Sequence, residues 1–296
     1  MQPLVFGHRG ASGYRPENTL EAFELAFAQG SDAIELDLVP TKDGHLIIRH
    51  ENVLSHTTNI AAVPQLAGLK HGKFLIWREV EDWFSEELTL EQIRLTRAIE
   101  RIPDVRPGSA KFDGQFAIPT IDDLLTADFV KGKKLILELK YPNHFLSVGL
   151  DTPAILADRL ASLPWRENGI DVVVESFDFA GLQRAKSLMP DDIKFVFLTE
   201  SWRIPKGGPA ELTKYLADIA ENFDGLSIDR VSIANHWQTV VADAHALGLM
   251  VFAWTARAED AENSVDEYYA DFIHTGVDGI FADQPDLLRF AVDSLT

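Results

Sequence analysis

The sequence predicts an α/β fold, a TIM-type (β/α)8 barrel that is somewhat irregular and carries a small insertion subdomain. Short apolar or β-branched segments alternate with amphipathic helical segments, and repeated strand–helix units imply a parallel sheet with right-handed crossovers. The 296 residues suit one such barrel, which takes about 250 residues, together with an insertion. A single long interval, residues 51–118, lacks the alternation.

Nine segments have the apolar, β-branched character of strands: residues 4–6, 33–39, 46–49, 134–139, 171–175, 193–198, 226–228, 249–254 and 277–281. A closed barrel of this type has eight strands. The turn at Lys42-Asp43-Gly44, between the second and third segments, is too short for the crossover that a parallel pair requires. We therefore expect one of these two segments to be distorted or to lie outside the regular barrel.

Helices are predicted from apolar residues at helical spacing, such as Leu20, Phe23 and Phe27 in the first of them. They cover residues 19–29, 120–130, 153–163, 179–188, 210–222, 235–247, 259–270 and 285–294. Thr120 and Asp123 have the spacing of a capping box, which predicts the start of the second helix.

The interval 51–118 is predicted to be an insertion subdomain between barrel segments 1–50 and 119–296, all within one domain of residues 1–296. One helix is predicted in it, over residues 89–99. Long structureless loops are uncommon in compact domains. A disordered linker is the alternative, and the aromatic residues of the interval argue against it: Phe74, Trp77, Trp83, Phe84, Phe112 and Phe116.

Composition excludes several classes of function. The chain has no cysteine, which excludes disulfides, thiolate nucleophiles and iron–sulfur clusters. It has 27 lysines and arginines against 46 acidic residues, a net charge of −19, which argues against nucleic-acid and anionic-membrane partners. At first sight this surplus also argues against a small anionic substrate. No transmembrane segment or signal sequence is expected, so the protein is either intracellular or has lost a signal peptide; the oligomeric state stays open.

Chemically active side chains gather where the predicted strands end. His8 and Arg9 follow the first strand, and Glu35 and Asp37 lie within the second. His50 ends the third, and further along the chain come Glu138, Lys140 and Trp254. Because catalysis in parallel barrels takes place at the carboxyl ends of the strands, these residues are the candidate active site.

The three carboxylates of this set predict a divalent cation. Glu35 and Asp37 are two residues apart in an apolar strand, so both point to one face, and a barrel interior rarely tolerates two unpaired acids. With Glu138 they form an all-oxygen ligand set, which suits Ca²⁺ or Mg²⁺; structural ion pairs are the alternative. His8 and His50 could form a proton-transfer pair, although a lone histidine is more often structural.

The order of these residues resembles that of a known enzyme family. The motifs are His8-Arg9-Gly10-Ala11-Ser12-Gly13, Pro16-Glu17-Asn18-Thr19, Glu35-Leu36-Asp37, Thr41-Lys42-Asp43-Gly44, His50-Glu51, Glu138-Leu139-Lys140, Ser176-Phe177, Trp254-Thr255 and residues 279–286. They resemble the glycerophosphodiester phosphodiesterases over nearly the whole chain. Asp82-Trp83-Phe84 and residues 115–120 resemble the longer, periplasmic or secreted members, which favours that location over the cytoplasm.

The resemblance implies a phospholipase-C-like phosphodiesterase fold and the hydrolysis of small glycerophosphodiesters to sn-glycerol 3-phosphate and an alcohol. It implies one divalent cation, with Ca²⁺ favoured and Mg²⁺ possible. It assigns roles by position: metal ligands at Glu35, Asp37 and Glu138, acid–base catalysis at His8 and His50, phosphate binding at Arg9 and Lys140, packing on the glycerol at Trp254, and a supporting role around His8 at Glu17 and Asn18.

The chain departs from the family pattern at Glu51, where Asp is usual, and at Ala282, where Thr is common. Neither change removes a metal-binding or proton-transfer group, so activity is expected. Two alternatives stay open: a phospholipase-D-like enzyme or cyclic-phosphate-forming lyase with the same site, and an inactive metal-binding interaction domain. The presence of all the candidate site residues argues against the inactive domain.

Overall fold

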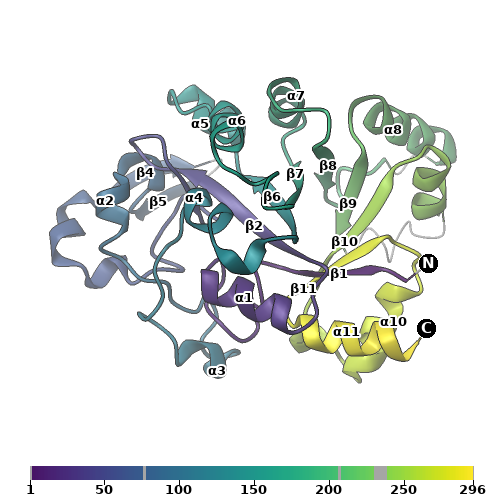
Figure 1. Ribbon diagram of the computed structural model, residues 1–296, viewed down its shortest axis with the longest axis horizontal. Helices are drawn as coiled ribbons and strands as arrows, with labels where there is room; N and C mark the ends of the chain where they lie inside the picture. The colour runs from purple at the N-terminus through teal and green to yellow at the C-terminus, as the bar shows by residue number, and fades with distance from the viewer. Residues whose placement is uncertain (1, 76–77, 206–207, 230–238, 296) are drawn as a thin grey trace.

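The computed structural model describes residues 2–75, 78–205, 208–229 and 239–295. Its central feature is a closed barrel of eight parallel strands surrounded by helices (Figure 1). The strands are β1 (Leu4–Gly7), β2 (Ala33–Pro40), β6 (Lys134–Leu139), β7 (Asp171–Ser176), β8 (Lys194–Thr199), β9 (Gly225–Asp229), β10 (Met250–Ala256) and β11 (Gly279–Ala282). Pairing of Phe6 with Ala33 and of Gly7 with Ile34 closes the ring between β1 and β2. The predicted fold class is confirmed.

The ninth predicted strand, β3 (Leu46–Ile48), lies outside the barrel as an antiparallel partner of β2. The turn between them is tight, with the Thr41 amide donating to the His45 carbonyl at 2.8 Å. A turn of this length can only produce a hairpin. The expectation that one strand of this pair lies outside the regular barrel is therefore confirmed.

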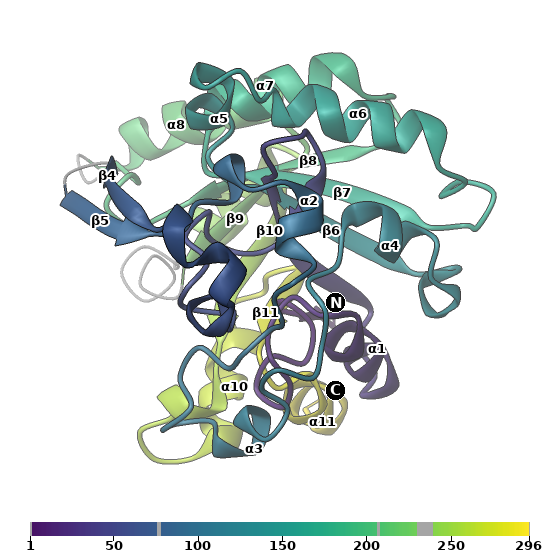
Figure 2. The same ribbon diagram turned by 90° about the vertical axis from the view of Figure 1, so that its left-hand side faces the viewer.

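Helices pack on the outside of the ring (Figures 1 and 2). They are α1 (Leu20–Ala28), α4 (Ile121–Leu125), α5 (Pro142–Ser147), α6 (Thr152–Ser162), α7 (Phe179–Leu188), α8 (Pro209–Asn222), α10 (Val265–Ile273) and α11 (Pro285–Ser294). Residues 239–246 are also helical, and the first four residues of the helix predicted over 235–247 lie outside the described residues. In the part of the chain that the structure describes, no helix is long and apolar enough to cross a membrane.

Two predicted helices begin or end elsewhere. The Thr120–Asp123 capping box is present, but α4 ends at Leu125 and a separate 3₁₀ turn, η4 (Asp128–Val130), follows. The helix predicted over residues 259–270 was wrong at its start. A 3₁₀ turn, η5 (Ala258–Asp260), comes first, and α10 begins only after Ser264, whose side chain accepts from the Glu267 amide. At α10 the Ser264 cap overrides the apolar spacing.

Strand alternation divides the core into two layers. The inner cluster takes one residue from each of seven barrel strands: Phe6, Ala33, Ile136, Val173, Val196, Phe252 and Phe281. The outer cluster holds their neighbours, such as Ile34, Leu36 and Leu135, against the helices. Since successive strand side chains point to opposite faces, every second residue after Ala33 points into the barrel. Glu35 and Asp37 therefore share the inner face, as predicted.

The segment 51–118 is built from short elements. They are η1 (Ile60–Ala62), η2 (Pro64–Leu69), the antiparallel strands β4 (His71–Leu75) and β5 (Arg78–Asp82), η3 (Ser85–Glu87), α2 (Leu90–Ile93) and α3 (Pro107–Ala110) (Figure 2). The helix predicted over residues 89–99 was wrong in length. The Thr96 amide and hydroxyl both bind the Ile93 carbonyl and end α2, and the Ala98 amide then pairs with the Phe116 carbonyl.

A separate hydrophobic cluster belongs mainly to this segment, and it includes Leu54, Ile60, Trp83, Leu88 and Ile93. Among the aromatic residues that predicted a subdomain, Trp83 and Phe84 are buried, whereas Phe74 is exposed and Trp77 lies outside the described residues. This packing supports the division into barrel segments 1–50 and 119–296 and an insertion of residues 51–118, which stays a prediction.

The inner layer leaves no room beside Phe6, which gives a test of barrel packing. A Cβ atom added at Gly279 would lie 2.2 Å from two ring atoms of Phe6. We expect Gly279→Ala to lower the free energy of unfolding by about 1–3 kcal/mol, the usual effect of overpacking. Gly108→Ala, where a Cβ meets nothing within 4 Å, is the matched control and should not lower stability. Urea unfolding followed by circular dichroism measures both, and equal midpoints would contradict the prediction.

Candidate active site

A pocket of about 820 Å³ opens at the carboxyl ends of the barrel strands. This volume is typical of sites for small molecules. Seven of the ten residues singled out from the sequence line it: His8, Arg9, Glu35, His50, Glu138, Lys140 and Trp254. Glu17, Asn18 and Asp37 are not among the lining residues, but each contacts Arg9.

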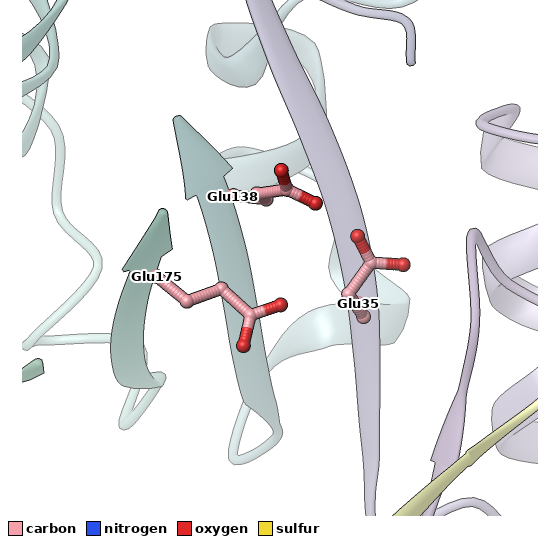
Figure 3. A group of neighbouring side chains, drawn as sticks. All are labelled: Glu35, Glu138 and Glu175. Carbon is pink, nitrogen blue, oxygen red and sulfur yellow. The ribbon is translucent and has the colours of Figure 1, made fainter. Parts of the chain in front are cut away.

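Three buried glutamates converge in the pocket from neighbouring strands (Figure 3). Glu35 comes from β2, Glu138 from β6 and Glu175 from β7, and one carboxylate oxygen of each lies within 4.8 Å of the others. Their side chains point into the barrel because Ala33, Ile136 and Val173, two residues earlier in each strand, belong to the inner cluster. They are 2%, 6% and 2% exposed.

Burial and mutual repulsion disfavour the ionised form of these three carboxyls. Burial, and then Asp37 and Glu175, raise the pKa of Glu35 well above its usual value. Burial, together with the nearby Glu138, raises the pKa of Glu175 in the same way. Burial also raises the pKa of Glu138 to about 7, although Lys140 opposes the shift. In the described structure Glu138 Oε1 and Glu175 Oε2 are buried without a hydrogen-bond partner. This donor set fits a hard divalent cation.

Asp37 lies among positive groups instead of in the glutamate cluster. Its carboxylate is 2.8 Å from Lys140 Nζ and 3.3 Å from Arg9 Nε, and it accepts a 2.7 Å hydrogen bond from Asn18 Nδ2. Burial opposes ionisation, but Lys140, His50 and Arg9 hold the pKa of Asp37 well below its usual range. The structure thus brings Glu35 and Glu138 together but groups them with Glu175. The role of Asp37 as a metal ligand stays a prediction.

Sequence reasoning missed Glu175. A signal was present, because Glu175 follows three valines at the end of a predicted strand and shares the inward parity of Val173. Glu138 and Glu175 also pair directly in the sheet register, which places their side chains side by side.

His8 comes immediately after β1, and a carboxylate holds its ring. His8 Nδ1 lies 2.5 Å from Asp283 Oδ1, which follows β11. Burial and the charge of Arg9 lower the pKa of His8 to about 4. The ring is therefore neutral near pH 7. Its Nδ1–H donates a hydrogen bond to Asp283, and its Nε2 carries no proton. Asp283, which lies 275 residues from His8 along the chain, had no assigned role in the sequence.

His50 has the same arrangement at the end of the β2–β3 hairpin. Its Nδ1 lies 2.6 Å from Glu51 Oε1, so the unusual glutamate of this chain takes the partner position. Burial, Arg9 and Lys140 lower the pKa of His50 to about 4. Both imidazoles thus present a neutral Nε2 as the free ring nitrogen.

Two cations face the carboxylates within the pocket. The ammonium of Lys140 is 2.5 Å from Glu138 Oε2 and also contacts Asp37. The Arg9 guanidinium contacts Glu17 at 3.2 Å, while the Arg9 amide donates to Glu35 Oε2 at 2.8 Å. Arg9 has a φ of 55°, and the following Gly10 has a φ of 81° with no room for a Cβ beside the Ala22 backbone. The glycine therefore permits the tight turn that places His8 and Arg9.

The supporting residues act on neighbours of His8. Glu17 contacts Arg9 and Arg101, and Asn18 holds Asp37. A fully buried arginine, Arg49, donates to the backbone carbonyls of both Glu17 and Asn18 and so fixes this loop. Trp254 lines the pocket with its ring against the edge of Phe177, at a centroid distance of 5.4 Å.

Comparison with known proteins identifies the family to which the chain belongs. Residues 8–287 match the model of the glycerophosphoryl diester phosphodiesterase family. The chain is 26% identical to a glycerophosphodiester phosphodiesterase of Haemophilus influenzae, over 96% of this chain and 88% of the other. It is 26% identical to one of Caldanaerobacter subterraneus, over 97% of both.

Among solved structures, the chain is similar to an Oleispira antarctica phosphodiesterase determined in complex with the product sn-glycerol-3-phosphate. The TM-score is 0.72 at 24% identity, covering 99% of this chain and 97% of the other, which shows a shared fold. The family model spans nearly all of the chain, from His8 of the first motif to the start of the last helix. The chain therefore belongs to the glycerophosphoryl diester phosphodiesterase family.

Proposed function

We propose that the protein hydrolyses glycerophosphodiesters to sn-glycerol 3-phosphate and an alcohol, with a divalent cation and two histidines. The observation that carries the proposal is the convergence of three kinds of group in one pocket of a member of this family. These are the glutamate cluster, two imidazoles that each have a carboxylate on Nδ1, and the cations of Arg9 and Lys140. Hydrolysis of a phosphodiester uses all three kinds of group. Negative charge develops on the phosphate oxygens, and protons move from the attacking hydroxyl and to the leaving alcohol.

Glu35, Glu138 and Glu175 would hold the cation, and Asp37 is proposed from the sequence as a further ligand. When bound, the cation supplies Lewis-acid stabilisation of charge on the phosphate oxygens. Ca²⁺ is favoured because it accepts several carboxylates in flexible geometry, whereas Mg²⁺ demands a near-ideal octahedron and keeps more water. The two orphaned carboxylate oxygens of Glu138 and Glu175 support this proposal.

The chain's own residues perform the remaining steps. Arg9 and Lys140 bind phosphate oxygens through charge-assisted hydrogen bonds. The neutral Nε2 of one histidine accepts the proton of the attacking hydroxyl, from water or the glycerol 2-hydroxyl. The other histidine first takes up a solvent proton on Nε2 and then donates it to the leaving alcohol. Asp283 and Glu51 stabilise the imidazolium form of each histidine, before proton donation in the acid and after proton uptake in the base, because each carboxylate is already hydrogen-bonded to Nδ1. The ring of Trp254 packs on the carbon atoms of the glycerol.

The first test is a product assay with a metal titration. Protein freed of metal by a chelator should not release glycerol 3-phosphate from glycerophosphocholine, and Ca²⁺ should restore release at lower concentration than Mg²⁺. No product with any divalent metal would refute the proposed activity. Phosphorus NMR of the same reaction identifies the final product, and an accumulating cyclic phosphate would favour the lyase alternative.

The second test concerns the ligand set. Glu175→Gln keeps the shape of the side chain but removes a buried charge from the cluster, so Ca²⁺ affinity should fall at least about 10- to 100-fold. Glu200→Gln is the matched control, because Glu200 lines the same pocket outside the cluster. Calorimetric titration with Ca²⁺ measures both. Asp37→Asn in the same series decides whether Asp37 is a ligand, and unchanged affinity in Glu175→Gln would remove Glu175 from the set.

The third test concerns the histidines. His8→Ala and His50→Ala should each lower kcat about 10²- to 10⁴-fold, since each removes one proton-transfer group. His45→Ala, at an exposed position on the β2–β3 turn, is the control and should keep wild-type turnover. Steady-state kinetics at saturating Ca²⁺ makes the comparison. Turnover that survives either active-site substitution would contradict the assigned pair.

A further inference from the structure

Two arginines of the segment 51–118 contact the carboxylates that hold the two histidines. Arg101 contacts Glu51, the partner of His50, and Arg106 contacts Asp283, the partner of His8. We propose that Arg101 and Arg106 are positioning residues that hold the two histidines through Glu51 and Asp283, an inference that rests on the proposed function. Neither arginine is among the residues lining the pocket, so each acts through its carboxylate.

Arg101 lies between two carboxylates and binds both with paired hydrogen bonds. Its Nη1 and Nη2 donate to Glu51 at 2.7 and 2.8 Å, and its Nε and Nη2 donate to Glu17 at 2.8 and 2.7 Å. Such bidentate pairs fix the plane of the carboxylate as well as its position. Glu17 in turn contacts Arg9, so one guanidinium ties a proposed phosphate-binding residue to the partner of His50.

The geometry at Glu51 shows what Arg101 contributes to catalysis. Glu51 Oε1 receives both Arg101 Nη1 at 2.7 Å and His50 Nδ1 at 2.6 Å. With the carboxylate plane fixed, the imidazole can donate its Nδ1 proton in one orientation, which leaves Nε2 for the pocket. Arg101 and His50 also keep the pKa of Glu51 below its usual value despite burial, so the carboxylate stays ionised. A free Glu51 side chain would rotate and release the ring.

Arg106 makes the corresponding contact on the other side of the site. Its Nη2 pairs with Asp283 Oδ2 while Asp283 Oδ1 faces His8. Its Nε donates to Glu259 at 2.6 Å, and its Nη1 donates to the Ser12 carbonyl at 3.2 Å. A second cation supports the same carboxylate, because Arg257 Nε lies 3.0 Å from Asp283 Oδ2. Loss of Arg106 should therefore disturb His8 less than loss of Arg101 disturbs His50.

Through these two arginines, the segment 51–118 contributes to the positions of the histidines. The barrel strands and their loops supply the histidines and metal-binding acids, whereas the guanidinium groups arrive from residues 101 and 106. A purely structural role would be to fasten the segment to the barrel. That role predicts lost stability without a specific loss of turnover, so the two roles can be separated by experiment.

The experiment compares Arg101→Met, Arg106→Met and Arg97→Met in the full-length protein, with glycerophosphocholine and saturating Ca²⁺. Arg97 is the matched control because, among the residues that the structure describes, its guanidinium donates to the backbone carbonyls of Arg94 and Thr96 and contacts no carboxylate of the site. We expect kcat to fall about 10- to 100-fold in Arg101→Met and less in Arg106→Met, with smaller changes in KM. Arg97→Met should match wild type. Unchanged kcat in Arg101→Met, or an equal loss in Arg97→Met, would overturn the inference.

A double-mutant cycle tests whether Arg101 acts through Glu51. If it does, Arg101→Met combined with Glu51→Gln should be no slower than the slower single variant, whereas multiplied losses would show independent roles and overturn the inference. Free guanidinium should partly restore kcat in Arg101→Ala, because it can replace the missing side-chain group; a variant that fails to fold would not be restored. Melting temperatures identify any unfolded variant. An inactive wild type refutes the proposed function itself, while an active wild type with active variants refutes only the positioning role.

Discussion

Four carboxylates point into one end of the barrel, where little water remains to screen their repulsion. Glu35, Asp37, Glu138 and Glu175 are there because strand alternation brings an inward position to the carboxyl end of β2, β6 and β7. Two cations, Arg9 and Lys140, offset part of this charge. The remaining imbalance supports the proposed divalent-cation site, because burial and charge conflict strongly among these side chains.

The same local balance explains how an acidic protein can accept an anionic substrate. The net charge of −19 describes the surface as a whole and still argues against nucleic acids. Inside the pocket the relevant charges are those within a few ångströms, and Arg9 and Lys140 lie directly beside the carboxylates. Salt bridges among these groups hold the two cationic side chains in place, which would reduce the reorganisation required by the proposed phosphate binding.

Local pattern was sufficient for much of the fold and for part of the site. All nine predicted strands are present, and the short turn at Lys42 correctly indicated a strand outside the ring. Glu138, His8 and His50 could be singled out because each lies at the end of a strand or follows one, and Glu35 because it shares one strand face with Asp37. Asp283, Arg101 and Arg106 could not, since their partners lie 50 to 275 residues away and no periodicity reports such contacts. The secondary structure of the segment 51–118 was the hardest to predict. Its conformation depends on 3₁₀ turns and side-chain hydrogen bonds, which leave no repeating pattern of apolar positions.

The β2–β3 hairpin has a consequence for how the inserted segment can change in evolution. The inserted segment begins directly after His50 and ends before Pro119. The Pro119 carbonyl accepts a 2.8 Å hydrogen bond from the Ile48 amide, and Thr120 forms a β-bridge with Ile47. Both ends of the inserted segment are thus tied to one short strand. Because the entropy of closing a loop grows only slowly with its length, residues can be added or removed between these ends at little cost to the barrel. The inserted segment can therefore vary between relatives while the barrel strands stay fixed.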